Sequence, residues 1–139
     1  MKSELPPCCY RVSVKALILD ETRTKFLVTQ GEGVGWELPG GGLERGEKPI
    51  DCLLREIKEE TAFNVLSIDP RPSYFITAPA RTKDFYIVNV FYEVKIADLN
   101  FTPSDECVAV KFISSEDVTN MDVMPTVIEF VKVFDPKNH

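Results

Sequence analysis

The chain has 139 residues, a formal net charge of −6, 44% hydrophobic residues and 27% charged residues. These values are typical of a globular protein, and the length predicts one domain, residues 1–139, with a buried core. The negative charge argues against non-specific nucleic-acid binding, and no apolar run is long enough to span a membrane. We therefore expect no nucleic-acid partner and no membrane partner, with the oligomeric state left open between monomer and homodimer.

Cysteine and histidine usage argues against two kinds of site. The chain has no Cys-x-x-Cys pair among Cys8, Cys9, Cys52 and Cys107, and its single histidine is His139. This pattern argues against a structural zinc site and against a Cys–His or Ser–His catalytic pair, so Cys52 and Cys107 are interpreted as core residues. The segment before Cys8 lacks the apolar stretch of a secretory signal, which predicts a cytoplasmic location.

Hydrophobic periodicity and turn residues predict the elements of the fold in chain order. We expect a strand (11–19), its hairpin turn (20–24) and returning strand (25–29), a flexible loop (31–35), a short strand (36–38), a helix (49–61), a short strand (65–68), a hairpin (73–78 and 85–96), a strand (108–113), a helix cap (114–117) and a last amphipathic helix (122–134). The apolar strand 85–96 should be central and buried on both faces. This order predicts an α/β fold with a mixed sheet between helices, in α/β/α layers.

The helix expected over residues 49–61 carries a buried stripe and an acidic face. Pro49 suits its first turn, and apolar residues recur with helical spacing at Ile50, Leu53, Leu54 and Ile57. Beside this stripe, three carboxylates share one arc because they are spaced i, i+3 and i+4, namely Glu56, Glu59 and Glu60. Like charges at this spacing repel, and they lie near the negative end of the helix dipole. A divalent cation with oxygen ligands would relieve that repulsion, whereas the alternative is an ordinary solvated acidic face.

A glycine-rich turn precedes this helix. The run Leu38-Pro39-Gly40-Gly41-Gly42 places flexible backbone where it can approach a phosphate closely. Taken alone, such a turn is often only a turn. Its fixed spacing from the three carboxylates is what indicates a site for metal and phosphate.

The combined segment Gly41–Phe63 resembles the signature of the Nudix hydrolases, enzymes that cleave nucleoside diphosphates linked to another group. That signature is Gly, five residues, Glu, seven residues, Arg-Glu, an aliphatic residue, any residue, Glu-Glu, any residue, Gly and an apolar residue. The positions in register are Gly41, Glu47, Arg55, Glu56, Ile57, Glu59, Glu60 and Phe63. One position departs from the signature, because Ala62 stands where the family has glycine. If the backbone there is left-handed, alanine costs roughly 1 kcal/mol.

The resemblance implies the Nudix fold and a set of roles. Glu56, Glu59 and Glu60 would be ligands of Mg²⁺, with Mn²⁺ as a substitute, and Glu59 or Glu60 would also handle the proton of the attacking water. Arg55 and Glu47 would pair to hold the loop and the helix together, with Gly41 supporting the site. The substrate would be a small nucleotide, bound in part at Gly40 and Gly41. The alternative function is a Nudix-fold module that binds nucleotide or regulates without hydrolysis, although such chains usually lose the acidic residues kept here.

Several candidates lie outside the signature. The family often recruits a further acidic residue from a loop, and Glu106 is the catalytic candidate here, with Asp105 and Asp98 behind it; the alternative is an ordinary loop residue. Trp36 could stack on a base or pack beside the glycine turn. Arg81 and Lys83 could contact phosphate or ribose, or be merely exposed. Neither Pro79 nor Met124, which stands near the start of the last helix, defines the substrate further.

Overall fold

The computed structural model describes residues 9–139, so the predictions made for Met1–Pro7 and for Cys8 lie outside the described residues. In chain order the elements are β1 (Tyr10–Leu17), β2 (Phe26–Gln30), β3 (Trp36–Glu37), β4 (Gly40–Gly42), α1 (Pro49–Glu60), β5 (Val65–Ile68), β6 (Tyr74–Pro79), β7 (Tyr86–Ile96), β8 (Ala109–Ile113), η1 (Ser115–Asn120), α2 (Pro125–Val131) and η2 (Pro136–Asn138). Within the described part of the chain, no helix is long and apolar enough to cross a membrane.

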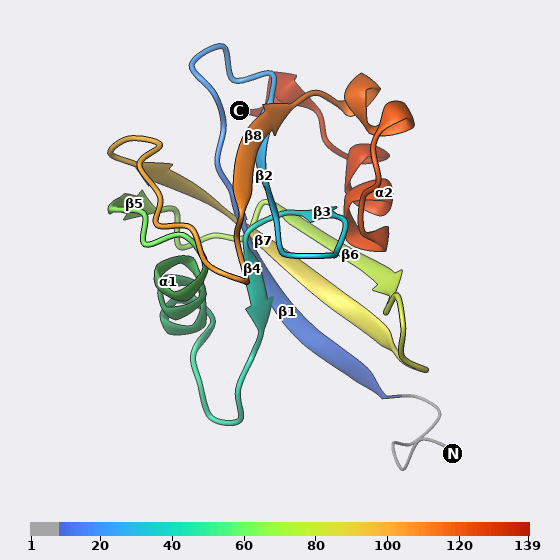
Figure 1. Cartoon of the computed structure of the whole chain (residues 1–139). Coiled ribbons are helices and arrows are strands. Elements are labelled where there is room, and N and C mark those ends of the chain that lie inside the picture. Colours follow the sequence, from blue (N-terminus) through green and yellow to red (C-terminus); the bar gives the residue numbers. More distant parts are fainter. Residues whose placement is uncertain (1–8) are drawn as a thin grey trace.

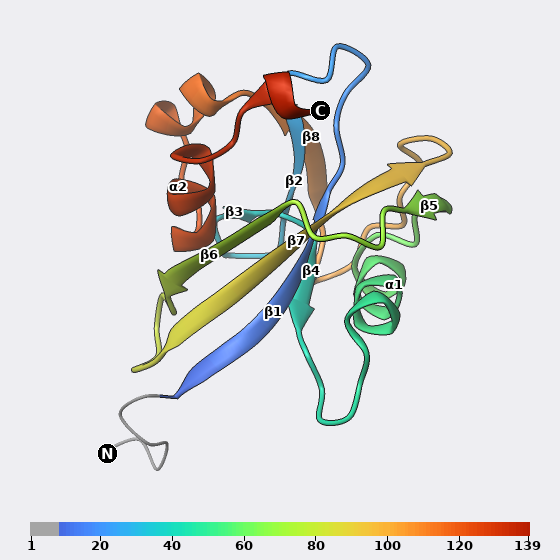
Figure 2. The same ribbon diagram turned by 180° about the vertical axis from the view of Figure 1, so that it is seen from behind.

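The strands form two sheets. The larger sheet is mixed and has the order β4-β1-β7-β5, with β6 pairing along the other half of β7, and β1 runs parallel to β7. The smaller sheet is antiparallel and has the order β3-β2-β8. Figure 1 shows α1 and α2 on opposite sides of this strand framework, and Figure 2 shows the same arrangement from behind.

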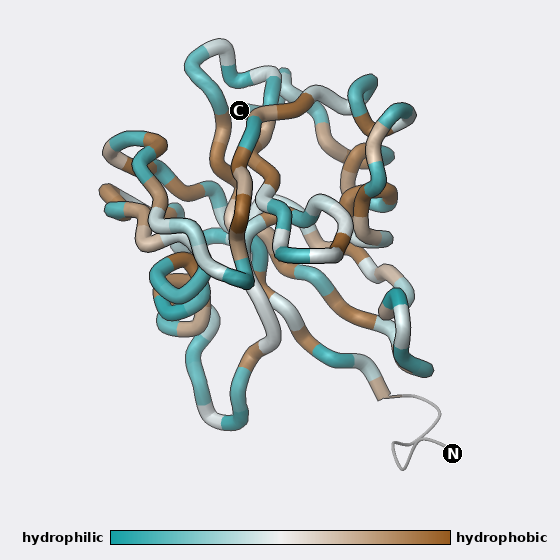
Figure 3. The backbone as a smooth tube through the Cα atoms, viewed as in Figure 1, coloured by the Kyte–Doolittle hydropathy of each residue, from teal (hydrophilic) through white to brown (hydrophobic). Residues whose placement is uncertain are grey.

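Two hydrophobic cores separate the layers. One lies beneath α1, where Leu53 and Ile57 pack with Val14, Leu27 and Val94. The other lies beneath α2, and its buried members include Leu17, Phe26, Phe91, Val127 and Phe130. In Figure 3 the hydrophobic residues concentrate on the strands and on the inner sides of the helices, whereas the turns are mostly hydrophilic. The predicted α/β fold with α/β/α layers is therefore confirmed. Cys52 and Cys107 are both fully buried, as expected of core residues.

The hairpin predicted from 11–19 and 25–29 exists only at its turn. Backbone hydrogen bonds join Leu27 N–H to the Ile18 carbonyl at 2.9 Å and Asp20 N–H to the Lys25 carbonyl at 3.0 Å. Beyond this point the two strands diverge, because β1 pairs with β4 and β7 whereas β2 pairs with β3 and β8. This divergence matters for function, since it frees one edge of β1 for the glycine strand β4.

The strand predicted to be central and buried on both faces is central but is not fully buried. β7 pairs with β1 on one side and with β5 and β6 on the other. Its ends are open, because Tyr86 is 52% exposed and Lys95 is also exposed. Ile96 still packs against the core beneath α1, but Tyr86 and Lys95 belong to neither core, so the apolar run of the sequence overstated the burial.

The last helix is shorter than predicted. Residues 122–124 are extended, because Trp36 N–H donates to the Asp122 carbonyl and Met124 N–H donates to the Trp36 carbonyl, both at 2.9 Å. Pro125 then opens α2, as its fixed φ favours the first helical turn. The sequence spacing predicted five inward-facing residues, of which four are buried and Val131 is half-buried against the same core; the buried ones are Val123, Val127, Phe130 and Phe134. The predicted cap at Ser114 is confirmed, but it opens the 3₁₀-helix η1.

Candidate functional site

Helix α1 holds its carboxylates against the glycine strand β4. Cys52, Leu53 and Ile57 are its buried residues, and they seat the helix on the sheet. Beyond Glu60 the helix ends at Thr61, whose hydroxyl and amide both donate to the Ile57 carbonyl, at 2.8 and 2.9 Å. The next residue, Ala62, has φ +57°, so the left-handed conformation considered from the sequence is present. The acidic face of the helix is thereby fixed beside β4.

Glu60 is held at the first residue of β4. Gly40 N–H donates to Glu60 Oε1 at 2.9 Å. Gly40 has φ +142°, and a Cβ at this position would lie 2.0 Å from the Val14 carbonyl oxygen, so only glycine fits. Burial raises the pKa of Glu60 to about 7, and the nearby charges of Glu56 and Glu106 act in the same direction. Gly40 N–H and Lys15 oppose the shift.

Glu56 lies directly against the next glycine. A Cβ at residue 41 would be 2.4 Å from Cδ of Glu56, so the carboxylate occupies the space that a side chain would need. Burial raises the pKa of Glu56, whereas Arg55 acts against this shift. Glu56 and Glu60 line one pocket of about 360 Å³ together with Glu37, Gly40 and Glu106. The pocket therefore collects several carboxylates beside the half-buried glycine backbone of β4.

Arg55 and Glu47 are joined by two hydrogen bonds, from Nε to Oε2 at 2.8 Å and from Nη2 to Oε1 at 3.0 Å. The second oxygen also accepts from Glu44 N–H at 3.1 Å, which ties the loop to the helix. The guanidinium of Arg55 lowers the pKa of Glu47 to about 2. Arg55 Nη1 donates to Glu56 Oε1 at 3.1 Å, so this pair also orients a carboxylate of the pocket.

Glu59 is placed differently from its two neighbours. Its side chain is 50% exposed, is bonded to Arg55 Nη1 at 3.2 Å and does not line the pocket. Among residues 9–139, no three acidic, cysteine or histidine side chains converge closely enough to hold a metal ion. The structure therefore brings Glu56 and Glu60 together in the pocket and leaves the half-exposed Glu59 outside its lining.

The loop before β8 contributes another part of the pocket wall. Asp105 and Glu106 both line it, and the Asp105 carbonyl accepts from Glu32 N–H at 2.9 Å. Glu106 is exposed, and its amide donates to the Ser104 hydroxyl at 3.2 Å. Asp98, the third acidic candidate, instead lines a separate cavity with Arg23 and Glu93.

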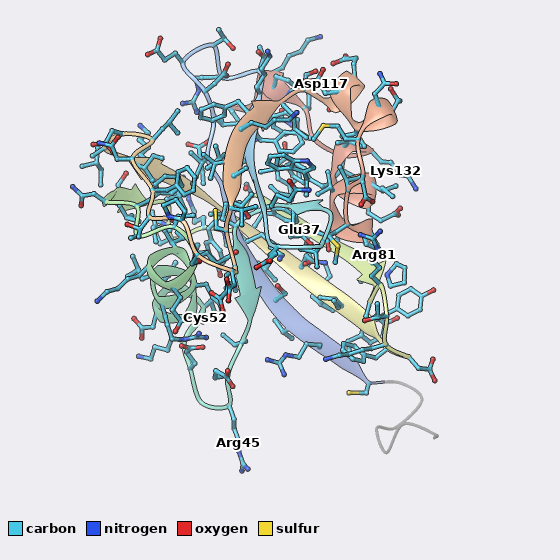
Figure 4. All side chains as sticks on the ribbon, viewed as in Figure 1. Glu37, Arg45, Cys52, Arg81, Asp117 and Lys132 are labelled. Carbon is cyan, nitrogen blue, oxygen red and sulfur yellow. The ribbon has the colours of Figure 1, made fainter. Side chains whose placement is uncertain are left out.

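Trp36 and Arg81 lie outside this pocket. Trp36 packs against the core beneath α2, and Lys111 Nζ lies 5.2 Å from the centre of its ring. Arg81 lines an adjacent cavity with Met124, the residue that precedes α2, and it donates to Asp122 Oδ1 at 3.1 Å. Figure 4 shows Arg81 beneath α2, across the strands from Cys52 on α1.

Sequence reasoning missed Glu37 and Lys15. Lys15 Nζ lies 3.8 Å from Glu37 Oε2, and both side chains are largely buried. Burial raises the pKa of Glu37, which Lys15 counteracts. The sequence offered one signal for Lys15: side chains alternate along a strand, which puts Lys15 on the same face of β1 as Ser13. The strand pairing that brings β3 close to β1 was not visible in the sequence.

Comparisons with known proteins agree with this geometry. The family model of the NUDIX domain matches residues 10–134. The chain is 32% identical over 87 residues to mRNA-decapping enzyme subunit 2 of Arabidopsis thaliana, a match covering 60% of this chain and 23% of that protein. It is 34% identical over 64 residues to RNA pyrophosphohydrolase of Nitratiruptor sp., covering 42% of this chain and 41% of the relative. The chain thus spans less than half the length of either relative.

Solved structures show the same fold. The MutT protein from Methanosarcina mazei Go1 aligns over 99% of both chains with a TM-score of 0.70 and 23% identity. The NUDIX domain of Shewanella oneidensis NrtR, solved in complex with ADP ribose, aligns over 89% of this chain and 85% of that one, with a TM-score of 0.67 and 20% identity.

Proposed function

Because the chain belongs to the Nudix superfamily, we propose that it is a magnesium-dependent hydrolase that cleaves the diphosphate bond of a nucleoside diphosphate linked to another group. The observation that carries this proposal is the pair Glu56 and Glu60, held side by side against the glycine strand in one pocket. Glycine backbone gives phosphate oxygens close access, and the carboxylates supply ligands for a hard cation.

The donor set of the pocket fits a divalent metal. Its acidic side chains offer only oxygen, the ligand that Mg²⁺ and Mn²⁺ prefer. Within residues 9–139, two cations pair with these side chains, Lys15 with Glu37 and Arg55 with Glu56. Glu56, Glu59 and Glu60 would hold the metal, with Glu59 adjoining Glu56 through their shared Arg55. When bound, the metal would neutralise phosphate charge and lower the pKa of the attacking water.

The residues of the chain would then position the water and the substrate. One of Glu59, Glu60 and Glu106 would take the proton from the water, and Glu60 and Glu106 both line the pocket. Arg55 would keep Glu56 in place from the Glu47 side. The side-chain-free backbone of Gly40 and Gly41 would border the diphosphate. Trp36 is left with a packing role, and Arg81 would border the substrate from the adjacent cavity.

A turnover panel tests the proposal. The purified protein is incubated with Mg²⁺ and one substrate at a time: ADP-ribose, a dinucleoside polyphosphate, a nucleoside triphosphate, or RNA with a 5′-triphosphate or a cap. The two RNA substrates are included because the chain is similar to an mRNA-decapping enzyme subunit and to an RNA pyrophosphohydrolase. We expect chelator-sensitive release of phosphate or nucleoside monophosphate. Glu60→Gln should lower turnover by about 10²–10⁴-fold. Glu116→Gln, an exposed carboxylate on η1, is the matched control and should leave turnover unchanged.

Two outcomes would count against the proposal. Near-normal turnover of Glu56→Gln, Glu59→Gln and Glu60→Gln at saturating Mg²⁺ would show that these carboxylates are not the metal ligands. Tight nucleotide binding without turnover of any substrate would favour the alternative, a Nudix-fold binding or regulatory module.

A further inference from the structure

A basic groove lies on the other side of the glycine strand. It has a volume of about 340 Å³ and is lined by Gly41 and Gly42 together with Arg11, Ser13, Lys15, Lys83, Phe85 and Ile87. Arg11, Ser13 and Lys15 share one face of β1 because side chains alternate along a strand. Lys83 comes from the connection between β6 and β7. Three cations from two segments therefore line a groove whose other walls are glycine backbone and apolar side chains.

Arg11 lies flat against the glycine strand. A Cβ at residue 42 would be 2.4 Å from Nη2 and 2.7 Å from Nε of Arg11, so the guanidinium occupies the space left by the missing side chain. Among residues 9–139, neither Arg11 nor Lys83 forms an ion pair with a carboxylate. Two of the three positive charges are thus available to an anionic ligand.

Lys15 links the groove to the carboxylate pocket. It is only 7% exposed, and its Nζ lies 3.8 Å from Glu37 Oε2, longer than a direct charge-assisted hydrogen bond. Lys15 is also near enough to Glu56 and Glu60 to oppose the rise in their pKa. A buried ammonium that is only loosely paired has capacity for a further anion.

The pocket and the groove are separated only by β4. Glu56 lies against Gly41 on one face of this strand, and Arg11 lies against Gly42 on the other. β4 is also the edge of its sheet, so one side of its backbone is not paired with another strand of that sheet. A flexible chain of phosphates can therefore pass around three glycines, with carboxylates on one side and cations on the other.

We propose that this basic groove binds a phosphate group beyond the diphosphate that is cleaved, so that the preferred substrates carry three or more phosphates in a row. This inference rests on the proposed function, because it extends the same site. A guanidinium fork matches phosphate oxygens in geometry, and Phe85 and Ile87 offer no side-chain acceptor that would compete for the cations.

Binding of inorganic tripolyphosphate, measured by calorimetry without metal, tests the groove apart from catalysis. We expect Arg11→Gln to weaken binding on the order of tenfold or more, and Lys83→Gln to weaken it several-fold. Arg71→Gln is the matched control, since it removes the same charge from a side chain that is 89% exposed and that pairs, within the described part of the chain, with Asp69 alone. Melting temperatures establish that each variant is folded. Equal affinity of the wild type and Arg11→Gln would overturn the proposal.

Substrate selectivity tests the same groove during turnover. The ratio of kcat/KM for ATP to kcat/KM for ADP-ribose should fall about tenfold in Arg11→Gln and stay constant in Arg71→Gln. A uniform loss on both substrates would overturn the proposal, because it would mean general damage. A short RNA with a 5′-triphosphate is measured in parallel. If Arg11→Gln lowers kcat/KM for the RNA alone, the groove binds the triphosphate of RNA; if it lowers kcat/KM for ATP alone, the groove binds the triphosphate of a free nucleotide. Absence of any metal-dependent turnover would instead contradict the proposed function, and the tripolyphosphate result would still stand.

Discussion

Gly41 and Glu56 fit together so closely that a Cβ on residue 41 would lie 2.4 Å from Cδ and 2.6 Å from Oε1 of Glu56. Gly41→Ala should therefore displace the carboxylate. The displaced group is the end of a flexible side chain, so we expect little change in the free energy of unfolding. Turnover should fall by about 10²-fold, because a misplacement of about 1 Å in a catalytic site has that effect. Steady-state kinetics and urea titration of the same variant check both parts.

Gly46→Ala is the matched control for this variant. Gly46 has φ +81°, and a Cβ there would meet nothing within 4 Å. Alanine in that conformation should cost about 1 kcal/mol of stability through backbone strain, with turnover unchanged. Gly41→Ala should thus lose turnover and keep its stability, whereas Gly46→Ala should lose stability and keep its turnover. If Gly41→Ala retains full activity, Glu56 is not needed in its present position.

The Glu47–Arg55 pair should make stability depend on pH in the acid range. Arg55 lowers the pKa of Glu47 from its ordinary 4.5 to about 2. A depressed pKa contributes stability that is fully present above pH 4.5 and is lost as the pH falls towards 2. Glu47→Gln cannot titrate, so the gap in unfolding free energy between it and the wild type should narrow over that window. Urea titrations from pH 6 to pH 2.5 measure this gap.

Glu44→Gln controls for the loss of a nearby charge. Glu44 precedes Glu47 in the same loop and is exposed, and the structure gives its carboxylate no ion pair with the described residues. The free energy of unfolding of Glu44→Gln should follow that of the wild type across the acid range. A constant gap between Glu47→Gln and the wild type would show that the pair does not hold the loop.

Local spacing made α1 and its surroundings predictable from the sequence. Pro49 and the stripe that includes Leu53 and Ile57 set the bounds and the buried face of the helix, which fix the carboxylates relative to Gly40 and Gly41. The signature of the family added the pairing of Arg55 with Glu47, which two short hydrogen bonds now describe.

Long-range pairing was beyond what the sequence could predict. The divergence of β1 from β2 and the bridge between Trp36 and Val123 depend on partners far along the chain. The same limit hid the Lys15–Glu37 contact, because it requires β3 to lie near β1. Helical spacing alone also placed Glu59 with Glu56 and Glu60, whereas in the structure Glu59 is half exposed and does not line the pocket.

In the metal-free protein, Glu60 should lower stability as the pH rises. Its pKa is raised from 4.5 to about 7, so the folded state holds a proton that the unfolded state has already lost above pH 4.5. The raised pKa of Glu60 therefore contributes up to about 3 kcal/mol to the free energy of unfolding. This contribution is fully present below pH 4.5 and is lost as the pH rises through 7. Urea unfolding in the presence of chelator should therefore give a higher free energy at pH 5 than at pH 8.

Metal should reverse this trend. Protons compete with a cation for carboxylates, so Mg²⁺ should raise the melting temperature more at pH 8 than at pH 5. Glu60→Gln should flatten the pH dependence seen with chelator and weaken the metal effect. An equal rise with Mg²⁺ in a variant with glutamine at residues 56, 59 and 60 would indicate general ion effects instead.

Ala62→Gly should stabilise the protein. Ala62 has φ +57° directly after the cap residue of α1, and its amide donates to the Ile57 and Lys58 carbonyls, both at 3.1 Å. Glycine removes the steric cost of this conformation but adds entropy to the unfolded chain, so the net gain should be up to about 1 kcal/mol. Ala97→Gly is the control, because Ala97 is exposed and is not among the residues with positive φ, so glycine there should destabilise the protein.

The site carboxylates precede Ala62 and keep their places, so kcat/KM should change little in either variant. Urea titration showing Ala62→Gly to be less stable than the wild type would reject the strained cap, and a large gain in turnover would mean that alanine at this position compromises the site.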